Sequence, residues 1–235
     1  MSEYKTYTKY NNLTFNEYLG KVFGTIAIGL GITAVVAFFV STFYVKLLYS
    51  LGALFVILMF GSLIAEVVIA IVLGAKLMQL QKSTAWGLYI AYSVLNGISL
   101  SSILLTYTTG SIWVAFIVSA IMFISMSIIG QTTKTDLSKF SGMVLPALIA
   151  LIVGTILNAL IFRSNMFSWV LTYVGIIIFL VLIAMDIQKL RDFYSYSFED
   201  SDAGEKLMVI GAFQLYLDFI NLFIRVLSIF GKRKD

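Results

Sequence analysis

Residues 207–230 read LMVIGAFQLYLDFINLFIRVLSIF, an apolar stretch long enough to cross a bilayer as one helix. Polar side chains and one glycine recur in it every three or four residues, which places them on a single helical face: Gly211, Gln214, Asp218, Asn221, Arg225 and Ser228. In a membrane such a face turns toward protein or water rather than lipid. The stretch therefore predicts a transmembrane helix that lies inside a bundle.

The rest of the chain is also rich in apolar residues. Of its 235 residues, 60% are hydrophobic and 12% are charged, whereas soluble domains usually carry about 25% charged residues. Apolar runs between polar breaks predict seven spans, at about 22–43, 50–75, 84–106, 112–131, 142–162, 168–190 and 207–230. No alternating pattern of barrel strands appears, so these runs can satisfy their backbones in lipid only as helices.

We therefore predict an all-α fold, a polytopic membrane protein of seven transmembrane helices with the last helix central in the bundle. A polar N-terminal tail (1–21) and a basic C-terminal tail (232–235) flank one transmembrane domain over 22–231. More lysines and arginines fall on the N-terminal side of the predicted spans than on the other side, which favours a cytoplasmic N-terminus. The basic residues of the C-terminal tail argue the other way, unless the last segment re-enters the membrane. We expect a bacterial plasma membrane, or the endoplasmic reticulum in a eukaryote.

Several functional classes are excluded by composition. Cysteine and histidine are both absent, which excludes disulfides, zinc and iron–sulfur sites, and a Ser-His-Asp triad. The GxGD pattern of intramembrane aspartyl proteases is missing, and residues 207–230 contain no lysine that could bind retinal. We predict no enzyme activity and no tightly bound cofactor. The basic residues lie at helix ends rather than in one patch, so we expect no nucleic-acid partner.

Two other segments carry local predictions. Small residues at Gly24, Ala27, Gly31 and Ala34 are spaced for close packing of the first span against another helix. The connection at about 191–206 is rich in acidic residues and reads as a solvated loop, with a cytosolic cation- or partner-sensing loop as the alternative.

Three acidic side chains fall inside predicted spans: Glu66, Asp186 and Asp218. A charge at the centre of a membrane costs a few kcal/mol or more, so such residues are functional candidates by default. Asp186 lies near the end of its span, so an alternative interpretation is that it is an interfacial carboxylate paired with Lys189 or Arg191.

Whether the two aspartates meet depends on where their helices end. At about 1.5 Å per residue, Asp186 is roughly 6 Å and Asp218 roughly 16 Å from the nearer end of its predicted span. They meet only if the sixth helix continues toward residue 194 or the seventh begins after residue 207. Two carboxyl groups that meet in a low dielectric would share one proton and titrate as a unit. Without histidine, such a pair is the best available acid sensor.

The same carboxyl groups, once ionised, are hard ligands suited to transient Ca²⁺ binding, with Glu66 as a further donor. Four other polar side chains could line a cation path: Asn96, Gln214, Asn221 and Arg225. For Gln214 and Asn221 the alternative is that they join helices through hydrogen bonds.

Four segments resemble the Bax inhibitor-1 family of transmembrane Bax-inhibitor-motif proteins, including its bacterial branch. They are FQLYLDFINLFIRVL (213–227), AMDIQKL (184–190), IAEVVIA (64–70) and NGISLSSIL (96–104), and the resemblance covers nearly the whole chain. It implies seven helices with the last surrounded by the other six, and a pH-sensitive Ca²⁺ leak gated by a hydrogen-bonded aspartate pair. The matching residues here are Asp186 and Asp218, with Glu66 as the acidic residue of the second helix.

Two positions depart from the family pattern. Some members latch the pair with an arginine at the end of the second helix, where this chain offers only Lys76, and lysine lacks the bidentate fork of arginine. Ser102 stands where we expect a proline.

The leading hypothesis is a passive Ca²⁺ pathway regulated by H⁺, in which protonation of the pair loosens its hold on a basic latch and shifts a closed–open equilibrium. The alternative is a membrane regulator that is no channel and binds a partner, such as a membrane protease or a cell-death or stress-response protein. Proton-coupled transport through the three acidic residues is a third possibility.

Overall fold

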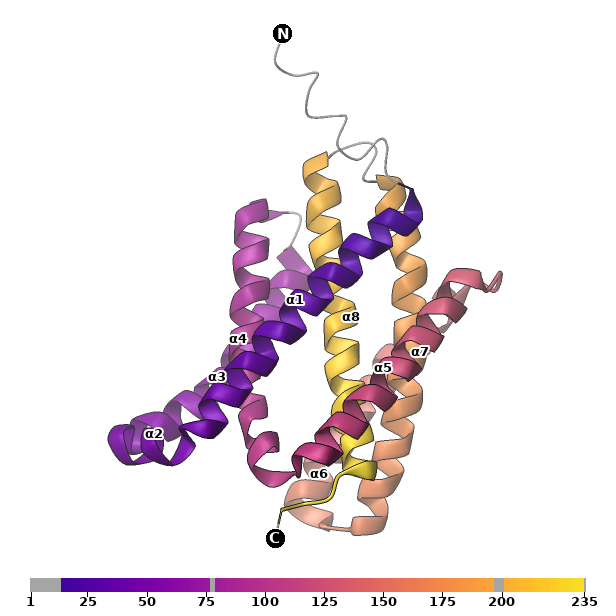
Figure 1. The fold of residues 1–235 in the computed structure, drawn as a ribbon. Coiled ribbons are helices and arrows are strands. Elements are labelled where there is room, and N and C mark those ends of the chain that lie inside the picture. The colour runs from indigo at the N-terminus through magenta and orange to yellow at the C-terminus, as the bar shows by residue number, and fades with distance from the viewer. Residues whose placement is uncertain (1–13, 77–78, 197–200, 235) are drawn as a thin grey trace. The chain divides into compact units, whose positions relative to one another are not determined.

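A computed structural model describes residues 14–76, 79–196 and 201–234 (Figure 1). These residues form helices and no β-strand. Seven of the helices are long and apolar enough to cross a membrane. The predicted all-α, seven-span fold is confirmed.

The helices run in the following order: α1 (Phe15–Thr42), α2 (Tyr44–Leu51), α3 (Ala53–Lys76), α4 (Lys82–Thr106), α5 (Thr109–Thr132), η3 (Leu137–Phe140), α6 (Ser141–Leu157), η4 (Asn158–Phe162), α7 (Asn165–Tyr196) and α8 (Ser201–Phe230). The first span begins earlier than its apolar run because of a capping box. The Thr14 hydroxyl accepts the Glu17 N–H, and the Glu17 carboxylate accepts the Thr14 N–H at 2.7 Å.

The connection expected at about 191–206 is mostly helical, so the prediction of a solvated loop is wrong there. α7 continues to Tyr196 and α8 begins at Ser201, leaving residues 197–200 outside the described part. Glu205, placed in that loop by the sequence, is a buried residue of α8 that forms an ion pair with Lys82. Hydropathy locates the apolar core of a helix, whereas the helix itself can continue into polar surroundings.

Contacts between helices divide the chain into two compact units. Unit 1 comprises Met1–Tyr107, Leu190–Tyr216 and Lys234–Asp235, and unit 2 comprises Thr108–Lys189 and Leu217–Arg233. Both α7 and α8 belong partly to each unit. No break in the sequence indicates this division, because it falls inside two continuous helices.

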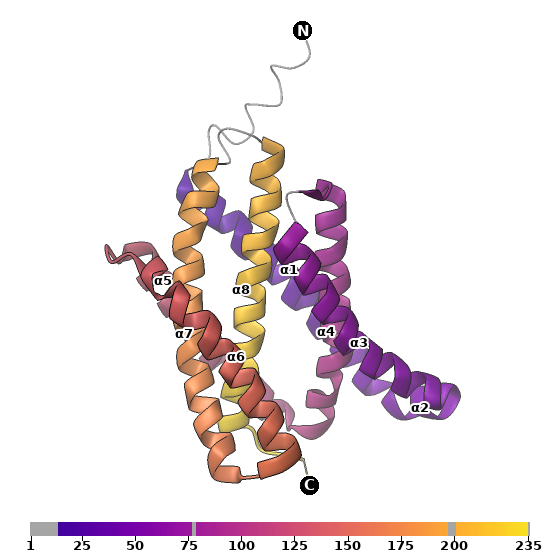
Figure 2. The ribbon, with the colours of Figure 1, turned by 180° about the vertical axis from the view of Figure 1, so that it is seen from behind.

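In unit 1, α4 lies against both α1 and α3, which Figure 2 shows from behind. α1 and α4 approach closely because glycine stands at two contacts. A Cβ on Gly97 would lie 2.7 Å from the Thr33 carbonyl oxygen, and a Cβ on Gly29 would overlap the Tyr89 hydroxyl. The small-residue face predicted to make such a contact is exposed instead: Gly24, Ala27, Gly31 and Ala34. That prediction is wrong because the spacing of small residues identifies a face but not the neighbour that it meets.

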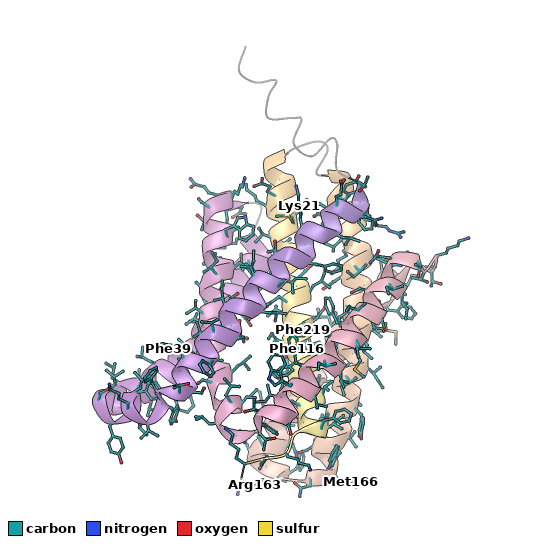
Figure 3. All side chains as sticks on the ribbon, in the orientation of Figure 1. Lys21, Phe39, Phe116, Arg163, Met166 and Phe219 are labelled. Carbon is teal, nitrogen blue, oxygen red and sulfur yellow. The ribbon has the colours of Figure 1, made fainter. Side chains whose placement is uncertain are left out.

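In unit 2, α5 lies directly on α7. A Cβ on Gly130 would lie 2.6 Å from the carbonyl oxygen of Ala184 and 3.0 Å from the Cβ of Ile187, the residues on either side of the stretch that holds Asp186. Phe116 of α5 packs edge-on against Phe219 of α8; both side chains are labelled in Figure 3. These contacts hold α5 against α7 and against the second half of α8.

α8 is the most buried of the seven spans. Within its most apolar segment 67% of the residues are buried, against 50% for α7 and 17–33% for the other five. This burial agrees with the interior position expected from the polar face of α8. The large apolar side chains that the other helices leave exposed are suited to lipid.

Candidate functional site

The two aspartates predicted to form a pair do meet, and both lie in unit 2. Their carboxyl groups form a hydrogen bond, and the side chains are nearly inaccessible, with Asp186 6% and Asp218 5% exposed. α7 continues six residues beyond its predicted span, to Tyr196, and α8 begins six residues before its own, at Ser201. Because both helices lengthen equally, Asp218 is still about 10 Å further from its helix end than Asp186 is from its own, and helix length alone does not explain why the two meet.

A lysine completes this site. The Lys189 Nζ donates to the Asp186 Oδ1 at 2.9 Å, and its own side chain is 47% exposed. Asp186 therefore forms both the ion pair and the carboxyl contact that the sequence presented as alternatives. Lys189 is on the same helix as Asp186, so this ion pair joins no second helix to the site.

A contact between two buried carboxyl groups has a consequence for their protonation. Two carboxyl groups can form a hydrogen bond only when one of them is protonated. Asp186 has an ammonium partner, whereas the Oδ2 of Asp218 is buried and has no hydrogen-bond partner in the described residues.

The connection between α5 and α6 is attached to α7 beside this site. The Gln188 Oε1 accepts the Leu137 N–H and its Nε2 donates to the Thr135 carbonyl oxygen, both at 2.9 Å. Just before Leu137, the Asp136 carboxylate accepts the Ser138 N–H at 2.9 Å. This hydrogen bonding to Ser138 holds the pKa of the exposed Asp136 carboxyl below its usual value.

The third acidic residue has its own surroundings in unit 1. Glu66 of α3 is 8% exposed and accepts two hydrogen bonds from α4, from Asn96 Nδ2 at 3.0 Å and from Ser99 Oγ at 2.5 Å. The Ser99 hydroxyl also lies 3.0 Å from that of Ser62. Two donors satisfy this carboxyl group without a cation.

Asn96 connects Glu66 to two further helices of unit 1. The Tyr216 hydroxyl of α8 donates to Asn96 Oδ1 at 3.0 Å and lies 2.7 Å from the Thr33 hydroxyl of α1. The chain of hydrogen bonds thus joins α1, α3, α4 and α8. Sequence reasoning missed Tyr216 and Thr33, because a tyrosine among aromatic residues and a threonine on an apolar helix carry no distinguishing pattern. The one available signal was that Tyr216 lies two residues before Asp218.

The remaining predicted residues behave differently from one another. Asn221 Nδ2 donates to the Leu217 carbonyl oxygen of its own helix, and Gln214 has a buried Oε1 without a partner. Neither forms the interhelical hydrogen bond considered for it, as far as the described residues extend. Arg225 Nη2 lies 3.5 Å from the Thr155 hydroxyl of α6. Lys76 is exposed at the end of α3, and Lys189 is the lysine that contacts the pair.

The three acidic residues belong to different units. Glu66 belongs to unit 1 and the aspartates to unit 2. Over residues 14–76, 79–196 and 201–234, no group of three or more His, Cys, Asp or Glu side chains could hold a metal ion. Among the described residues of unit 2, the buried acidic side chains are Asp186 and Asp218.

Comparisons with known proteins cover nearly the whole chain. A family model described as "Inhibitor of apoptosis-promoting Bax1" matches residues 15–235. The inner membrane protein YbhL of Escherichia coli (strain K12) is 39% identical over 220 residues, 92% of each chain. An uncharacterized protein of Borreliella burgdorferi is 34% identical over 98% of each chain. An uncharacterized membrane protein of Streptococcus pyogenes serotype M1 is 32% identical over 99% of each chain.

Proposed function

The chain belongs to the Bax inhibitor-1 family, and from its buried aspartate pair we propose that it is a pH-sensitive Ca²⁺ leak channel. The observation that carries the proposal is the hydrogen bond between Asp186 and Asp218, two carboxyl groups on different helices, each more than nine-tenths buried. Seven apolar helices and the inner-membrane relative support the coarser statement that this is an integral protein of the bacterial plasma membrane. The proposed N-terminus is cytoplasmic.

The proton of the pair is the proposed switch. While one proton is shared, the hydrogen bond holds α7 to α8 within unit 2. When that proton leaves, two negative charges remain in contact, and two unit charges 4 Å apart repel by about 4 kcal/mol at an effective dielectric constant near 20. Lys189 offsets only part of this repulsion, because its ammonium group is half exposed to solvent. Deprotonation therefore favours separation of α7 from α8.

The basic latch expected from the family has no counterpart in these contacts. An interhelical latch would open the site on protonation, whereas Lys189 and Asp186 lie three residues apart on one helix. The direction of gating consequently follows from the carboxyl contact itself, and we expect flux to rise as the pair loses its proton.

The deprotonated pair also attracts a cation. Ca²⁺ prefers six to eight oxygen ligands, and two carboxylates supply too few for tight binding. A permeant ion must be attracted enough to enter and held weakly enough to leave. An incomplete carboxylate site is therefore suited to passage rather than storage.

The test is Ca²⁺ entry into dye-loaded liposomes that contain the purified protein, scanned from about pH 5 to 8. Asp218→Asn keeps the size of the side chain and lets an amide N–H donate permanently to Asp186, so it imitates the protonated pair. We expect low, pH-independent flux in this variant. Asp136→Asn is the matched control, the same chemical change at an exposed site outside the spans, and it should retain the wild-type profile.

Two results would count against the proposal. A wild-type protein without flux above empty liposomes at every pH would favour the alternative, a membrane regulator acting through a partner. A pH profile that survives in Asp218→Asn would place the sensor elsewhere.

A further inference from the structure

Arg225 is a second charged residue on the polar face of α8, seven residues after Asp218. Its stem lies over α7 at a glycine. A Cβ on Gly175 would lie 3.0 Å from the Arg225 Nε and 3.3 Å from its Cδ. The guanidinium group continues to α6, where Nη2 lies 3.5 Å from the Thr155 hydroxyl. Arg225 thus spans the width of unit 2 from α8 across α7 to α6.

This arginine does not neutralise the aspartate pair. Gly175, which its Nε approaches, precedes Asp186 by eleven residues on α7, or about 16 Å along the helix axis. No carboxylate in the described residues forms an ion pair or hydrogen bond with Arg225. A positive charge that is partly buried and lacks an acidic partner is costly in a membrane, which makes Arg225 a candidate for a role other than ion pairing.

Its position supplies that role. Asp218, Asn221 and Arg225 lie on one face of α8, separated by three and four residues. A cation that moves along this face toward the aspartates from the end of α8 at Phe230 passes the guanidinium group first. Gly175 leaves room on α7 for the Arg225 side chain, which packs directly over it. A fixed positive charge on such a path is an electrostatic barrier to cations.

We propose that Arg225 limits the rate at which divalent cations reach the aspartate pair from the C-terminal end of α8. This inference rests on the proposed leak function and adds to it a residue that sets the size of the leak. The pair decides at which pH the pathway conducts, and Arg225 decides how much Ca²⁺ passes once it does. The two roles are separable, because the guanidinium group lies well away from the carboxyl groups.

The experiment compares Arg225→Gln with Arg225→Lys in Ca²⁺-loaded flux assays across the same pH range. Glutamine removes the charge and keeps a polar side chain of intermediate length, while lysine keeps the charge and loses the planar guanidinium group. We expect Ca²⁺ flux in Arg225→Gln to rise about tenfold above wild type, equivalent to about 1.4 kcal/mol, and flux in Arg225→Lys to stay within about twofold. The pH midpoint should be the same in all three proteins.

The outcomes separate a barrier from a structural role. Equal flux in wild type and Arg225→Gln, with the pH dependence intact, overturns the barrier and leaves the leak proposal standing. A similar increase in both variants also overturns it, because the effect would then follow packing rather than charge. A shifted pH midpoint in Arg225→Gln would show that the arginine acts on the pair directly. Absence of flux in wild type and every variant overturns both proposals together.

Discussion

Gly130 provides the sharpest test of how Asp186 is held in place. This glycine is buried in α5 and faces the α7 backbone at Ala184 and the side chain of Ile187. In Gly130→Ala the added Cβ would lie 2.6 Å from the carbonyl oxygen of Ala184 and 3.0 Å from its Cα. Ordinary carbon contacts are about 3.5–4.0 Å, and backbone atoms cannot rotate away as a flexible side chain can. α5 must therefore move off α7 by a substantial part of an ångström.

Two effects of opposite sign decide the magnitude. Replacing glycine with alanine inside a helix gains about 1 kcal/mol from backbone entropy and helix propensity. Inserting a methyl group into a close contact costs about 1–3 kcal/mol. Gly31→Ala isolates the first effect, because Gly31 is inside α1 and has nothing within 4 Å of its ideal Cβ position. The free energies of unfolding of the two variants should differ by about 1–3 kcal/mol, with Gly130→Ala the less stable.

The assay is reversible unfolding of the purified protein in mixed micelles, monitored by circular dichroism. Gly31→Ala should equal or exceed wild type, and Gly130→Ala should fall below Gly31→Ala. Because the displaced helix segment carries Asp186, the pH midpoint of Ca²⁺ flux should also shift in Gly130→Ala alone. Equal stability of the two variants would refute the close contact between α5 and α7.

Three further predictions concern the surroundings of the acidic residues. Tyr216→Phe removes the hydroxyl group between Thr33 and Asn96, so the free energy of unfolding should fall by about 1–3 kcal/mol, while Tyr173→Phe at an exposed position should leave it unchanged. Gln188→Ala removes both hydrogen bonds to the α5–α6 connection. Hydrogen exchange at the Leu137 amide should therefore accelerate, without a matching change at amides inside the helices. Unchanged exchange at Leu137 would contradict the attachment of this connection to α7. The Asp136 carboxyl should titrate by NMR below its usual pKa. Its capping contribution to stability is then complete at neutral pH and is lost as the pH falls through that lowered value. A titration midpoint at or above the usual value would show that the Ser138 hydrogen bond does not persist in solution.

The fold could be predicted because its signal is strong and local. Runs of about 20 apolar residues have one solution in lipid, and the polar face of 207–230 correctly indicated a buried last helix. The ends of the helices could not be predicted as well. α1, α7 and α8 continue beyond their apolar runs because capping groups and ion pairs, such as those of Thr14 and Glu205, support helix where hydropathy is low. The division into two units was invisible because it depends on contacts between distant segments.

The candidate site, like the fold, could be predicted only in part. Asp186 and Asp218 were recognisable as costly intramembrane charges, yet the apolar runs did not show that they meet, because both α7 and α8 continue beyond those runs. The sequence suggested Lys189 only as the partner of an interfacial Asp186. In the structure, Asp186 forms this ion pair and also contacts Asp218. Tyr216 and Thr33 were not predicted, because a hydroxyl group gains significance only from the partner that folding brings within 3 Å of it.

Infrared spectroscopy of the protonated carboxyl groups can observe directly the proton that Asp186 and Asp218 are proposed to share. Wild type, Asp218→Asn and Glu66→Gln would be titrated in liposomes, so that the contribution of each buried carboxyl group is identified by its loss. We expect a protonated-carboxyl band in wild type and Glu66→Gln that disappears with the same midpoint at which Ca²⁺ flux rises, and that is absent in Asp218→Asn. A band unaffected by Asp218→Asn, or one whose midpoint differs from that of the flux, would show that the proton of this pair is not the switch.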